Sequence, residues 1–270
     1  MDLGIQGKKA IMAGGSAGMG RATAERLAEA GCELTISARR EPRLNQAAKE
    51  IAEKYGVPVT PVVADSSTEG GRSALFAACP DPDILAITIK PPDPNGDPLK
   101  VTPEMWRGAI ETALIGPIEI MRHYISGMKE RGWGRIVNIA TFSAKNPMIW
   151  RLMSGPPRSA LINYTSSVSR HIAKHGVIMN NILPGMFATE GASELMNDQK
   201  VIENLAEVYD LEPTQEAVMK NFLETNIIPT GFMGHSDDLA PMAAFLCSEL
   251  ARYIVGQNIV IDGGQYPTIF

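Results

Sequence analysis

A glycine-rich turn between an apolar strand and a helix near the N-terminus most constrains the fold of this chain. Residues 9–13 form an apolar run that predicts a buried strand, and the alanine-rich residues 21–30 predict a helix. The turn between them carries Gly14, Gly18 and Gly20. Glycine lets the backbone turn tightly and approach a pyrophosphate, and the helix that follows offers unpaired N–H groups. The sequence therefore predicts a phosphate cradle at this junction.

The second predicted strand, residues 33–38, indicates which dinucleotide fits the turn. An NAD-specific site of this kind has a carboxylate about 20 residues beyond the glycines, where it binds the ribose 2′-hydroxyl. This chain has Arg39 and Arg40 there. A guanidinium cannot accept a hydrogen bond from a hydroxyl, but it pairs with a 2′-phosphate through a planar fork of donors. We therefore expect NADP(H) rather than NAD(H); solvated loop charges are the alternative interpretation of the two arginines.

Strands and helical segments alternate along the rest of the chain. This alternation predicts a Rossmann-like α/β fold with a doubly wound parallel sheet, helices on both faces, and one domain over residues 1–270. Ligands of such a sheet bind beyond the carboxyl ends of the strands. The remaining predicted helices are residues 42–55, 70–78, 103–131, 157–175 and 237–249, and the remaining predicted strands are residues 59–63, 84–89, 135–139, 177–183 and 258–261.

Composition and charge argue against several other classes. The net charge of −5, spread without long blocks, predicts neither a nucleic-acid nor an anionic membrane partner. The three cysteines are widely spaced and predict reduced core residues, and the four histidines lack metal-ligand spacing, so no metal site is expected. No apolar run approaches the ~20 residues that span a bilayer, and the first strand leaves no room for a signal peptide. We expect a cytoplasmic protein.

With these elements in place, the chain resembles the short-chain dehydrogenase/reductase family over essentially its whole length. The closing segment is particularly similar to the β-ketoacyl-acyl-carrier-protein reductase branch. The motifs that carry the resemblance are AGGSAGMG at 13–20, Asp65, DIL at 83–85, GRIVNIAT at 134–141, NNILPGMFAT at 180–189 and FLCSELARYIVGQNIVIDGG at 245–264.

The resemblance implies a set of cofactor contacts. An acidic residue at the place of Asp65 contacts the adenine, and the segment from Pro184 to Thr189 folds over the nicotinamide. A loop hydroxyl without that contact is the alternative interpretation of Thr189. The expected cofactor-binding residues are Gly14, Ser16, Ala17, Gly18, Met19, Gly20, Arg39, Arg40, Asp65, Ser66, Pro184, Gly185 and Thr189.

The catalytic positions depart from the family's pattern. Family members use Asn, Ser, Tyr and Lys, with Tyr-x-x-x-Lys on one face of a helix, and this chain has no Tyr-x-x-x-Lys. Alignment of GRIVNIAT places Thr141 at the family's serine. A gap-free count back from NNILPG places Ser154 at the tyrosine and Arg158 at the lysine. Tyr164 instead falls on an apolar helix face, ~15 Å along the helix axis from Ser154.

Two further positions depart from the family. A count from Trp106 along the long predicted helix places Ala113 where the family has its asparagine, and residues 87–90, Ile-Thr-Ile-Lys, replace the usual Asn-Asn-Ala-Gly. The proline-rich loop 91–98 that follows is expected either to border the site or to act as a rigid connector. The departures gather at one site and leave the cofactor motifs in place.

These replacements predict different chemistry at the substrate carbonyl. A serine is a weaker acid than a tyrosine, but Ser154 is suited to donate a hydrogen bond to a developing alkoxide whose charge Arg158 stabilises. Lys145 is a second candidate proton donor, because a desolvated lysine titrates closer to neutrality, and Arg151 is a weaker candidate. Other interpretations stay open: Ser154 as a helix cap before two prolines, Thr141 as a hydroxyl bonded to backbone, and the cations as solvated charges.

Residues 190–234 predict a helical lid, with helices at 193–209 and 214–226. Its apolar side chains either form an adaptable wall for a hydrophobic substrate of moderate size or pack the lid onto the domain. The side chains concerned are Met186, Phe187, Leu195, Met196, Phe222 and Met233.

The expected function is NADP(H)-dependent oxidation or reduction of a carbonyl or alcohol. The alternatives are a non-redox enzyme on the same fold (a lyase, an isomerase or a dehalogenase) and a cofactor-binding homologue without activity. The resemblance also implies a homotetramer or homodimer formed through the helices near 103–131 and 157–175. The apolar C-terminal residues 263–270 are consistent with such a contact.

Overall fold

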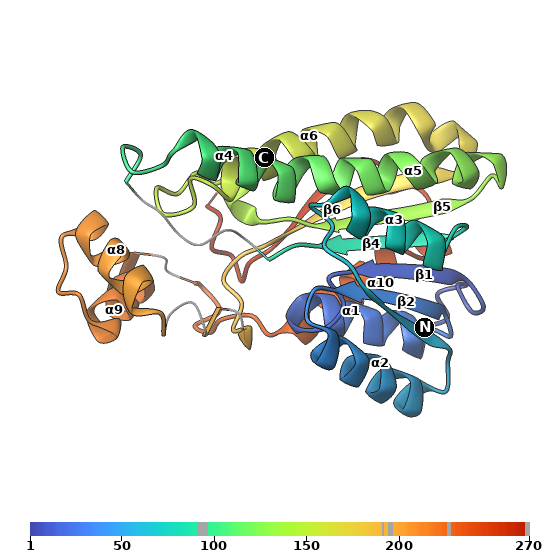
Figure 1. Ribbon diagram of the computed structural model, residues 1–270, viewed down its shortest axis with the longest axis horizontal. Helices are drawn as coiled ribbons and strands as arrows, with labels where there is room; N and C mark the ends of the chain where they lie inside the picture. Colours follow the sequence, from blue (N-terminus) through green and yellow to red (C-terminus); the bar gives the residue numbers. More distant parts are fainter. Residues whose placement is uncertain (91–96, 191, 194–196, 226–227, 268–270) are drawn as a thin grey trace.

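The computed structural model describes residues 1–90, 97–190, 192–193, 197–225 and 228–267. Within them, seven strands form one parallel sheet in the order β3-β2-β1-β4-β5-β6-β7, and helices cover both of its faces (Figure 1). The predicted Rossmann-like, doubly wound α/β fold is therefore confirmed.

The strands follow the apolar runs of the sequence closely. They are β1 Lys9–Ala13, β2 Glu33–Ala38, β3 Val59–Val63, β4 Ile84–Thr88, β5 Gly134–Ile139, β6 Val177–Pro184 and β7 Asn258–Ile261. The α-helices whose bounds lie in the described ranges are α1 Gly18–Glu29, α2 Glu41–Tyr55, α3 Glu69–Ala78, α4 Pro103–Ile110, α5 Gly116–Glu130, α6 Gly155–Ile172, α8 Gln199–Tyr209, α9 Gln215–Thr225 and α10 Ser236–Leu246.

Alternate side chains of the strands supply two separate cores. Met12 and Ile36 point to the face covered by α1, α2 and α10. Ile11 and Leu85 point to the face covered by α3, α5 and α6. In Figure 1, α1 and α2 lie below the sheet, and α5 and α6 lie above it. Because successive residues of a strand point to opposite faces, a sheet covered on both sides has continuous apolar runs rather than alternation.

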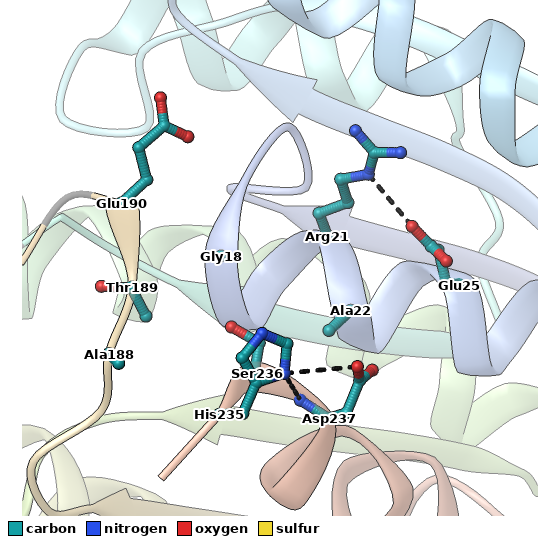
Figure 2. Close-up of a pocket in the computed structure, with 10 residues that line it drawn as sticks. All are labelled: Gly18, Arg21, Ala22, Glu25, Ala188, Thr189, Glu190, His235, Ser236 and Asp237. Carbon is teal, nitrogen blue, oxygen red and sulfur yellow. Dashed lines mark hydrogen bonds and ion pairs between the residues drawn. The ribbon is translucent and has the colours of Figure 1, made fainter. Parts of the chain in front are cut away.

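The strand order reverses between β1 and β4. β2 and β3 extend the sheet on one side of β1, and β4 to β7 extend it on the other. The loops that leave the carboxyl ends of β1 and β4 therefore diverge and open a crevice for a ligand. The glycine turn after β1 lies at this crevice, beside residues 188–190 after β6 and the start of α10 (Figure 2).

The long helix predicted over residues 103–131 is interrupted. α4 ends at Ile110, a five-residue π-helical turn runs over Glu111–Ile115, and α5 begins at Gly116. Pro117 has no N–H to donate to the carbonyl four residues before it. The N–H of the preceding residue, Gly116, donates to the carbonyl of Glu111, five residues before it, which is the hydrogen bond of a π-helix. The residues predicted as one long helix are therefore helical from 103 to 130, and the sequence analysis missed only the π-helical turn before this proline.

Of the helices whose bounds lie in the described ranges, α8 and α9 belong to the predicted lid segment; residues 190, 192 and 193 are helical as well, but the helix predicted over 193–209 is not continuous, because residues 197 and 198 are not helical. α8 begins at Gln199, where the Asp198 carboxylate accepts a hydrogen bond from the Lys200 N–H (2.9 Å) and caps the helix. Of the predicted wall residues, Leu195 and Met196 lie outside the described residues, as do most residues of the loop 91–98.

An apolar cluster, called the lid cluster below, packs α8 and α9 against the loop before α6. Its buried members are Trp150, Val201, Ile202, Leu205, Ala206 and Val218. Of the predicted wall residues, Met186 packs against the lid cluster, whereas Phe187 packs into the core beneath α1 and α10. The contact of Met186 agrees with the interpretation in which these side chains pack the lid onto the domain, and the wall for a hydrophobic substrate stays a prediction.

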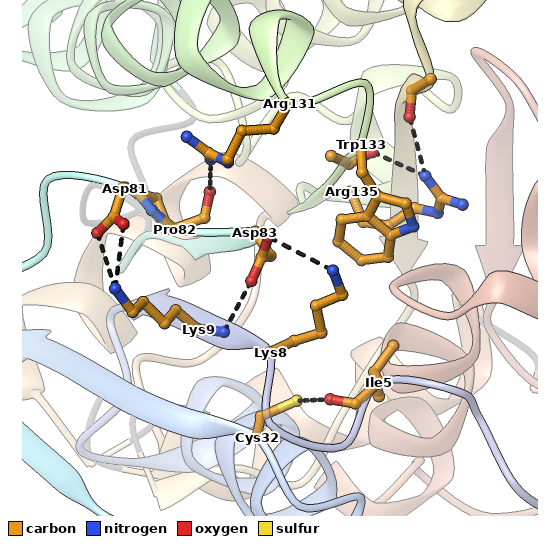
Figure 3. Close-up of polar contacts among 12 residues, drawn as sticks. Ile5, Lys8, Lys9, Cys32, Asp81, Pro82, Asp83, Arg131, Trp133 and Arg135 are labelled. Carbon is orange, nitrogen blue, oxygen red and sulfur yellow. Dashed lines mark hydrogen bonds and ion pairs between the residues drawn. The ribbon is translucent and has the colours of Figure 1, made fainter.

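The amino ends of the strands are tied together by charged side chains (Figure 3). The Asp83 carboxylate accepts a hydrogen bond from the Lys9 N–H (3.1 Å) and forms an ion pair with Lys8 (3.6 Å). Arg135, at the start of β5 and only 3% exposed, donates to the carbonyls of Ser248 (3.1 Å), Gly134 (3.0 Å) and Gly176 (3.1 Å). These contacts stabilise the amino ends of the strands, on the side of the sheet opposite the crevice.

We expect Arg135→Met to lower the free energy of unfolding by about 2–4 kcal/mol, because each buried carbonyl left without a donor costs roughly 1–3 kcal/mol. The exposed Arg252 provides a matched control, and Arg252→Met should change the stability by less than about 0.5 kcal/mol. Urea denaturation followed by circular dichroism measures both. Equal stability of the two variants would contradict the role given to Arg135.

Candidate active site

The glycine turn leaves the N-terminus of α1 open. Its N-cap residue, Ala17, makes no side-chain cap, so no side chain of the N-cap occupies the first N–H groups of the helix. The N–H groups of Gly14 and Gly15 donate to the Ser37 carbonyl (2.8 and 3.0 Å) and fix the turn against β2. The positive end of the helix dipole and the free N–H groups together favour an anion here.

The turn has no space for side chains at two of its glycines. A Cβ on Gly14, whose φ is +88°, would lie 2.3 Å from the Thr88 carbonyl oxygen at the end of β4. A Cβ on Gly20 would lie 2.1 Å from the Gly14 carbonyl oxygen. Gly18 (φ +52°) faces Thr189 across the crevice. The turn therefore has the shape of a cradle that a pyrophosphate approaches closely, and these residues fit a dinucleotide.

The predicted adenosine end of the site lies after β2 and β3. The Arg39 guanidinium is largely exposed and lies 3.9 Å from an Asp65 carboxylate oxygen. Burial would raise the pKa of Asp65, but two hydrogen bonds from Ser67 and the charge of Arg39 outweigh burial and lower that pKa. Asp65 therefore stays ionised, beside a cation that is free to turn toward solvent.

The segment after β6 closes the other side of the crevice. The Thr189 hydroxyl oxygen accepts a hydrogen bond from the Ala192 N–H (3.2 Å), so it already has one partner in its own loop. Glu190 forms an ion pair with Arg43 of α2, which joins this segment to the adenosine side. The cavity in Figure 2 lies between these residues, Gly18 and the start of α10.

Ser154 and Arg158 form a buried pair at the start of α6. A guanidinium nitrogen of Arg158 donates to the Ser154 hydroxyl oxygen (2.7 Å), and the other donates to the Ile89 carbonyl (3.1 Å) just beyond β4. Arg158 is 2% exposed, and burial lowers its pKa to about 10, so it remains charged at neutral pH. Ser154 is the N-cap residue by position, but its side chain makes no cap hydrogen bond.

Thr141 lies at the carboxyl end of β5 with a second hydroxyl beside it. Its oxygen accepts from the Ser143 N–H (3.3 Å) and lies 3.0 Å from the Ser143 hydroxyl. The Ser159 hydroxyl donates to the Ala144 carbonyl (2.8 Å) and ties this loop to α6. The sequence analysis did not single out the buried Ser143; its spacing of two residues from Thr141, typical of a hydroxyl turn, was the available signal.

The remaining candidates lie at different places. Arg151 stacks on Trp150, with 4.0 Å from its guanidinium carbon to the ring centroid. Lys145 is half-buried, and its ammonium forms no hydrogen bond or ion pair with any residue of the described ranges. Tyr164 packs into the core beneath α5, where burial raises its pKa. Ala113 is fully buried in the π-helical turn and offers no polar side chain.

Two further searches covered the described part of the chain. Among those residues, no group of three or more histidines, cysteines and carboxylates lies close enough to hold a metal ion. None of the helices found there is long and apolar enough to cross a bilayer.

Comparison with known proteins decides the family. The family described as enoyl-(acyl carrier protein) reductase matches residues 13–265. The chain belongs to the short-chain dehydrogenase/reductase family. The 3-oxoacyl-[acyl-carrier-protein] reductase FabG of Aquifex aeolicus is 28% identical, over 98% of this chain and 100% of that relative. The resemblance to this family and to its reductase branch is confirmed.

Two other reductases are similar over nearly the whole chain. The NADPH-dependent reductase BacG of Bacillus subtilis is 28% identical, with 97% of this chain and 99% of BacG covered. The structure of L-sorbose reductase from Gluconobacter frateurii, solved with NADPH and L-sorbose, is 28% identical and superposes with a TM-score of 0.86 over 100% of both chains. Both comparisons therefore span nearly the whole chain.

We expect Gly20→Ala to weaken NADPH binding by roughly tenfold or more, because its Cβ must displace the cradle and such overpacking costs about 1–3 kcal/mol. Gly70→Ala in α3 is the control, since no atom lies within 4 Å of that Cβ position. Fluorescence titration measures NADPH affinity, and circular dichroism checks folding. A folded Gly20→Ala protein with unchanged affinity would contradict the assignment of the cradle.

Proposed function

We propose that this short-chain dehydrogenase/reductase is an NADP(H)-dependent oxidoreductase that acts on a carbonyl or alcohol group of a moderately sized hydrophobic molecule. The observation that carries the proposal is the closed glycine cradle at the uncapped start of α1, with Arg39 at the adenosine end. The NADPH-dependent relatives support the same cofactor. When bound, NADPH supplies the hydride for the carbonyl carbon, while the carbonyl oxygen takes a proton.

Each part of the cofactor site has a distinct task in this proposal. The turn from Gly14 to Gly20, including Ser16, Ala17 and Met19, holds the pyrophosphate by its N–H groups. Arg39 pairs with the 2′-phosphate, and the ionised Asp65 contacts the adenine. On the far side of the crevice, Thr189 holds the nicotinamide end.

The hydroxyl groups of Thr141 and Ser154 bind the substrate oxygen. Ser154 accepts a hydrogen bond from Arg158, and Thr141 accepts one from the Ser143 N–H, so each can donate its own proton to the substrate. Arg158 is charged and buried, and its field stabilises the negative charge that develops on that oxygen. These groups stabilise an alkoxide without a strong acid.

The proton itself needs a separate donor in this scheme. General acid catalysis is worth roughly 10²–10⁴-fold in rate, so a site with a weak acid turns over slowly but is not inactive. Lys145 is our candidate donor, because it follows Thr141 by one short helical turn and has no partner among the described residues. The lid cluster and Met186 border the apolar part of the substrate.

We also propose that the protein acts in the cytoplasm as a homotetramer or homodimer. Ile110 and Ile115, beside α5, are 39% and 37% exposed, which is high for large apolar side chains and suits a contact between subunits. Light scattering at micromolar concentration tests the assembly, and a monomeric mass would overturn it.

The native protein should bind NADPH more tightly than NADH, by roughly tenfold or more, because a hydrogen bond to a charged group is worth about 1.5–3 kcal/mol. Arg39→Asp should reduce the difference in affinity between NADPH and NADH or reverse it. Arg107→Asp, at another highly exposed arginine, serves as the control and should leave it unchanged. Fluorescence titration with both cofactors provides the measurement. Equal affinities of the native protein for NADPH and NADH would contradict the assignment of Arg39 to the 2′-phosphate.

Three variants test the catalytic assignment with the best substrate of a ketone panel. Thr141→Ala and Arg158→Ala should each lower kcat on the order of 100-fold, because they remove groups that stabilise charge in the transition state. Tyr164→Phe should leave kcat within a few-fold, since its hydroxyl lies on the α5 side of the helix. NADPH affinity should stay nearly constant in all three.

The opposite result is equally informative. An inactive Tyr164→Phe protein beside a fully active Arg158→Ala protein would mean that the alignment is wrong and that the site must be rebuilt around Tyr164. Thermal denaturation of each variant separates lost activity from lost folding, and Arg158→Lys tests whether charge alone is sufficient at this buried position.

A further inference from the structure

Two arginines lie at the start of α6 without an acidic partner among the described residues. Arg158 is 2% exposed, and all its contacts are with neutral oxygens: the Ser154 hydroxyl, the Ser154 carbonyl and the Ile89 carbonyl. Arg151 is half-buried on the Trp150 ring. A buried cation is costly unless an anion compensates it, so this arrangement is incomplete as it stands.

A hydrogen-bonded turn brings Arg151 close to the first residues of α6. The N–H groups of Ser154 and Gly155 donate to the Arg151 carbonyl (2.9 and 2.8 Å), and Arg158 in turn donates to the Ser154 hydroxyl oxygen (2.7 Å). Both arginines therefore lie within one turn of Ser154. The positive end of the α6 dipole adds to their charge.

The electrostatics agree with this geometry. Burial and, to a smaller extent, the charge of Arg158 together lower the pKa of Arg151 to about 9. The two cations therefore affect each other, and an anion between them would relieve both their repulsion and their desolvation. The guanidinium of Arg158 has five N–H donors, more than its neutral oxygen partners use, so donors remain for a ligand.

The carboxylates of the surrounding elements are engaged elsewhere. Glu111 of the π-helical turn pairs with Arg72, Glu190 pairs with Arg43, and Glu207 of α8 pairs with Lys100. The phosphates of the cofactor have their own partners at α1 and β2 in the proposed function. None of these groups therefore supplies an anion to the arginine pair.

We propose that Arg151 and Arg158 bind a carboxylate of the substrate, so that the enzyme acts on hydrophobic oxo acids or the corresponding hydroxy acids. This proposal rests on the proposed function, because Ser154 holds the reacting oxygen there. Arg158 contacts Ser154 directly, so the carboxylate lies within a few bonds of the carbonyl, as in a 2-oxo or 3-oxo acid. Trp150 belongs to the lid cluster and places the apolar part of the acid under α8.

A binding experiment with unreactive probes tests the arginine pair without turnover. The probes are 4-phenylbutanoate and 4-phenylbutanamide, which have nearly the same shape and differ in charge. Calorimetric titration of the NADPH-loaded protein should give binding of the acid roughly 10- to 100-fold tighter than that of the amide, as expected for a charge-assisted hydrogen bond.

Single substitutions test whether the two arginines cause the difference in affinity between the acid and the amide. Arg151→Gln should reduce the difference between acid and amide to within about threefold. Arg170→Gln, at an exposed arginine near the other end of α6, is the matched control and should retain it. Arg158→Gln is measured in parallel. Because Arg158 is buried, the Arg158→Gln protein is the one at risk of not folding, and in that case the result for Arg151→Gln alone tests the proposal.

Two outcomes overturn the proposal. One is equal or absent binding of acid and amide by the native protein, also with the shorter pair 3-phenylpropanoate and 3-phenylpropanamide. The other is selectivity that survives Arg151→Gln. A failure of the proposed function is recognised separately, since it appears as absent NADPH binding in the fluorescence titration or as selective binding of acids without reduction of 2-oxo-4-phenylbutanoate.

Discussion

The close contact between the glycine turn and the end of β4 is the constraint on which the rest of the site depends. Thr88 lies against the backbone of Gly14 and Gly20, so the turn keeps its shape only while β4 stays paired with β1. The next residue, Ile89, accepts the hydrogen bond of Arg158 from α6. Consecutive residues at one strand end therefore hold the proposed cofactor cradle and the proposed catalytic cation in a fixed relation.

The charged side chains at the amino ends of the strands have partners, whereas the arginines near the carboxyl ends lack acidic partners among the described residues. At the amino ends, Arg135, Lys8 and Lys9 are matched with carbonyls and carboxylates, so these contacts contribute to stability. At the carboxyl ends, Arg151 and Arg158 have no acid partner in the described part of the chain. A fold accepts uncompensated buried charge where a ligand completes it, which is why we place recognition of the substrate there.

The proposed catalytic group differs in kind from one based on a tyrosine and a lysine. A phenol and an ammonium exchange protons within reach of neutral pH, whereas a serine hydroxyl and a guanidinium do not. With a pKa of about 10, Arg158 keeps its charge while Ser154 and Thr141 supply oriented hydroxyl groups. Such a site stabilises an oxyanion by electrostatics and takes its proton from a different group or from solvent.

The sequence by itself determined the fold class, the strand runs, the glycine cradle and the spacing that brings Ser154 under Arg158, because each depends on periodicity or on residues a few positions apart. Only the tertiary structure showed that the Ser154 side chain does not cap α6, since its partner is the Arg158 side chain and not the helix N–H groups. It also decided the contact between Arg158 and Ile89, which are 69 residues apart in the chain. Contacts of that kind depend on how parallel strands bring distant loops to one edge, and no local pattern in the sequence records them.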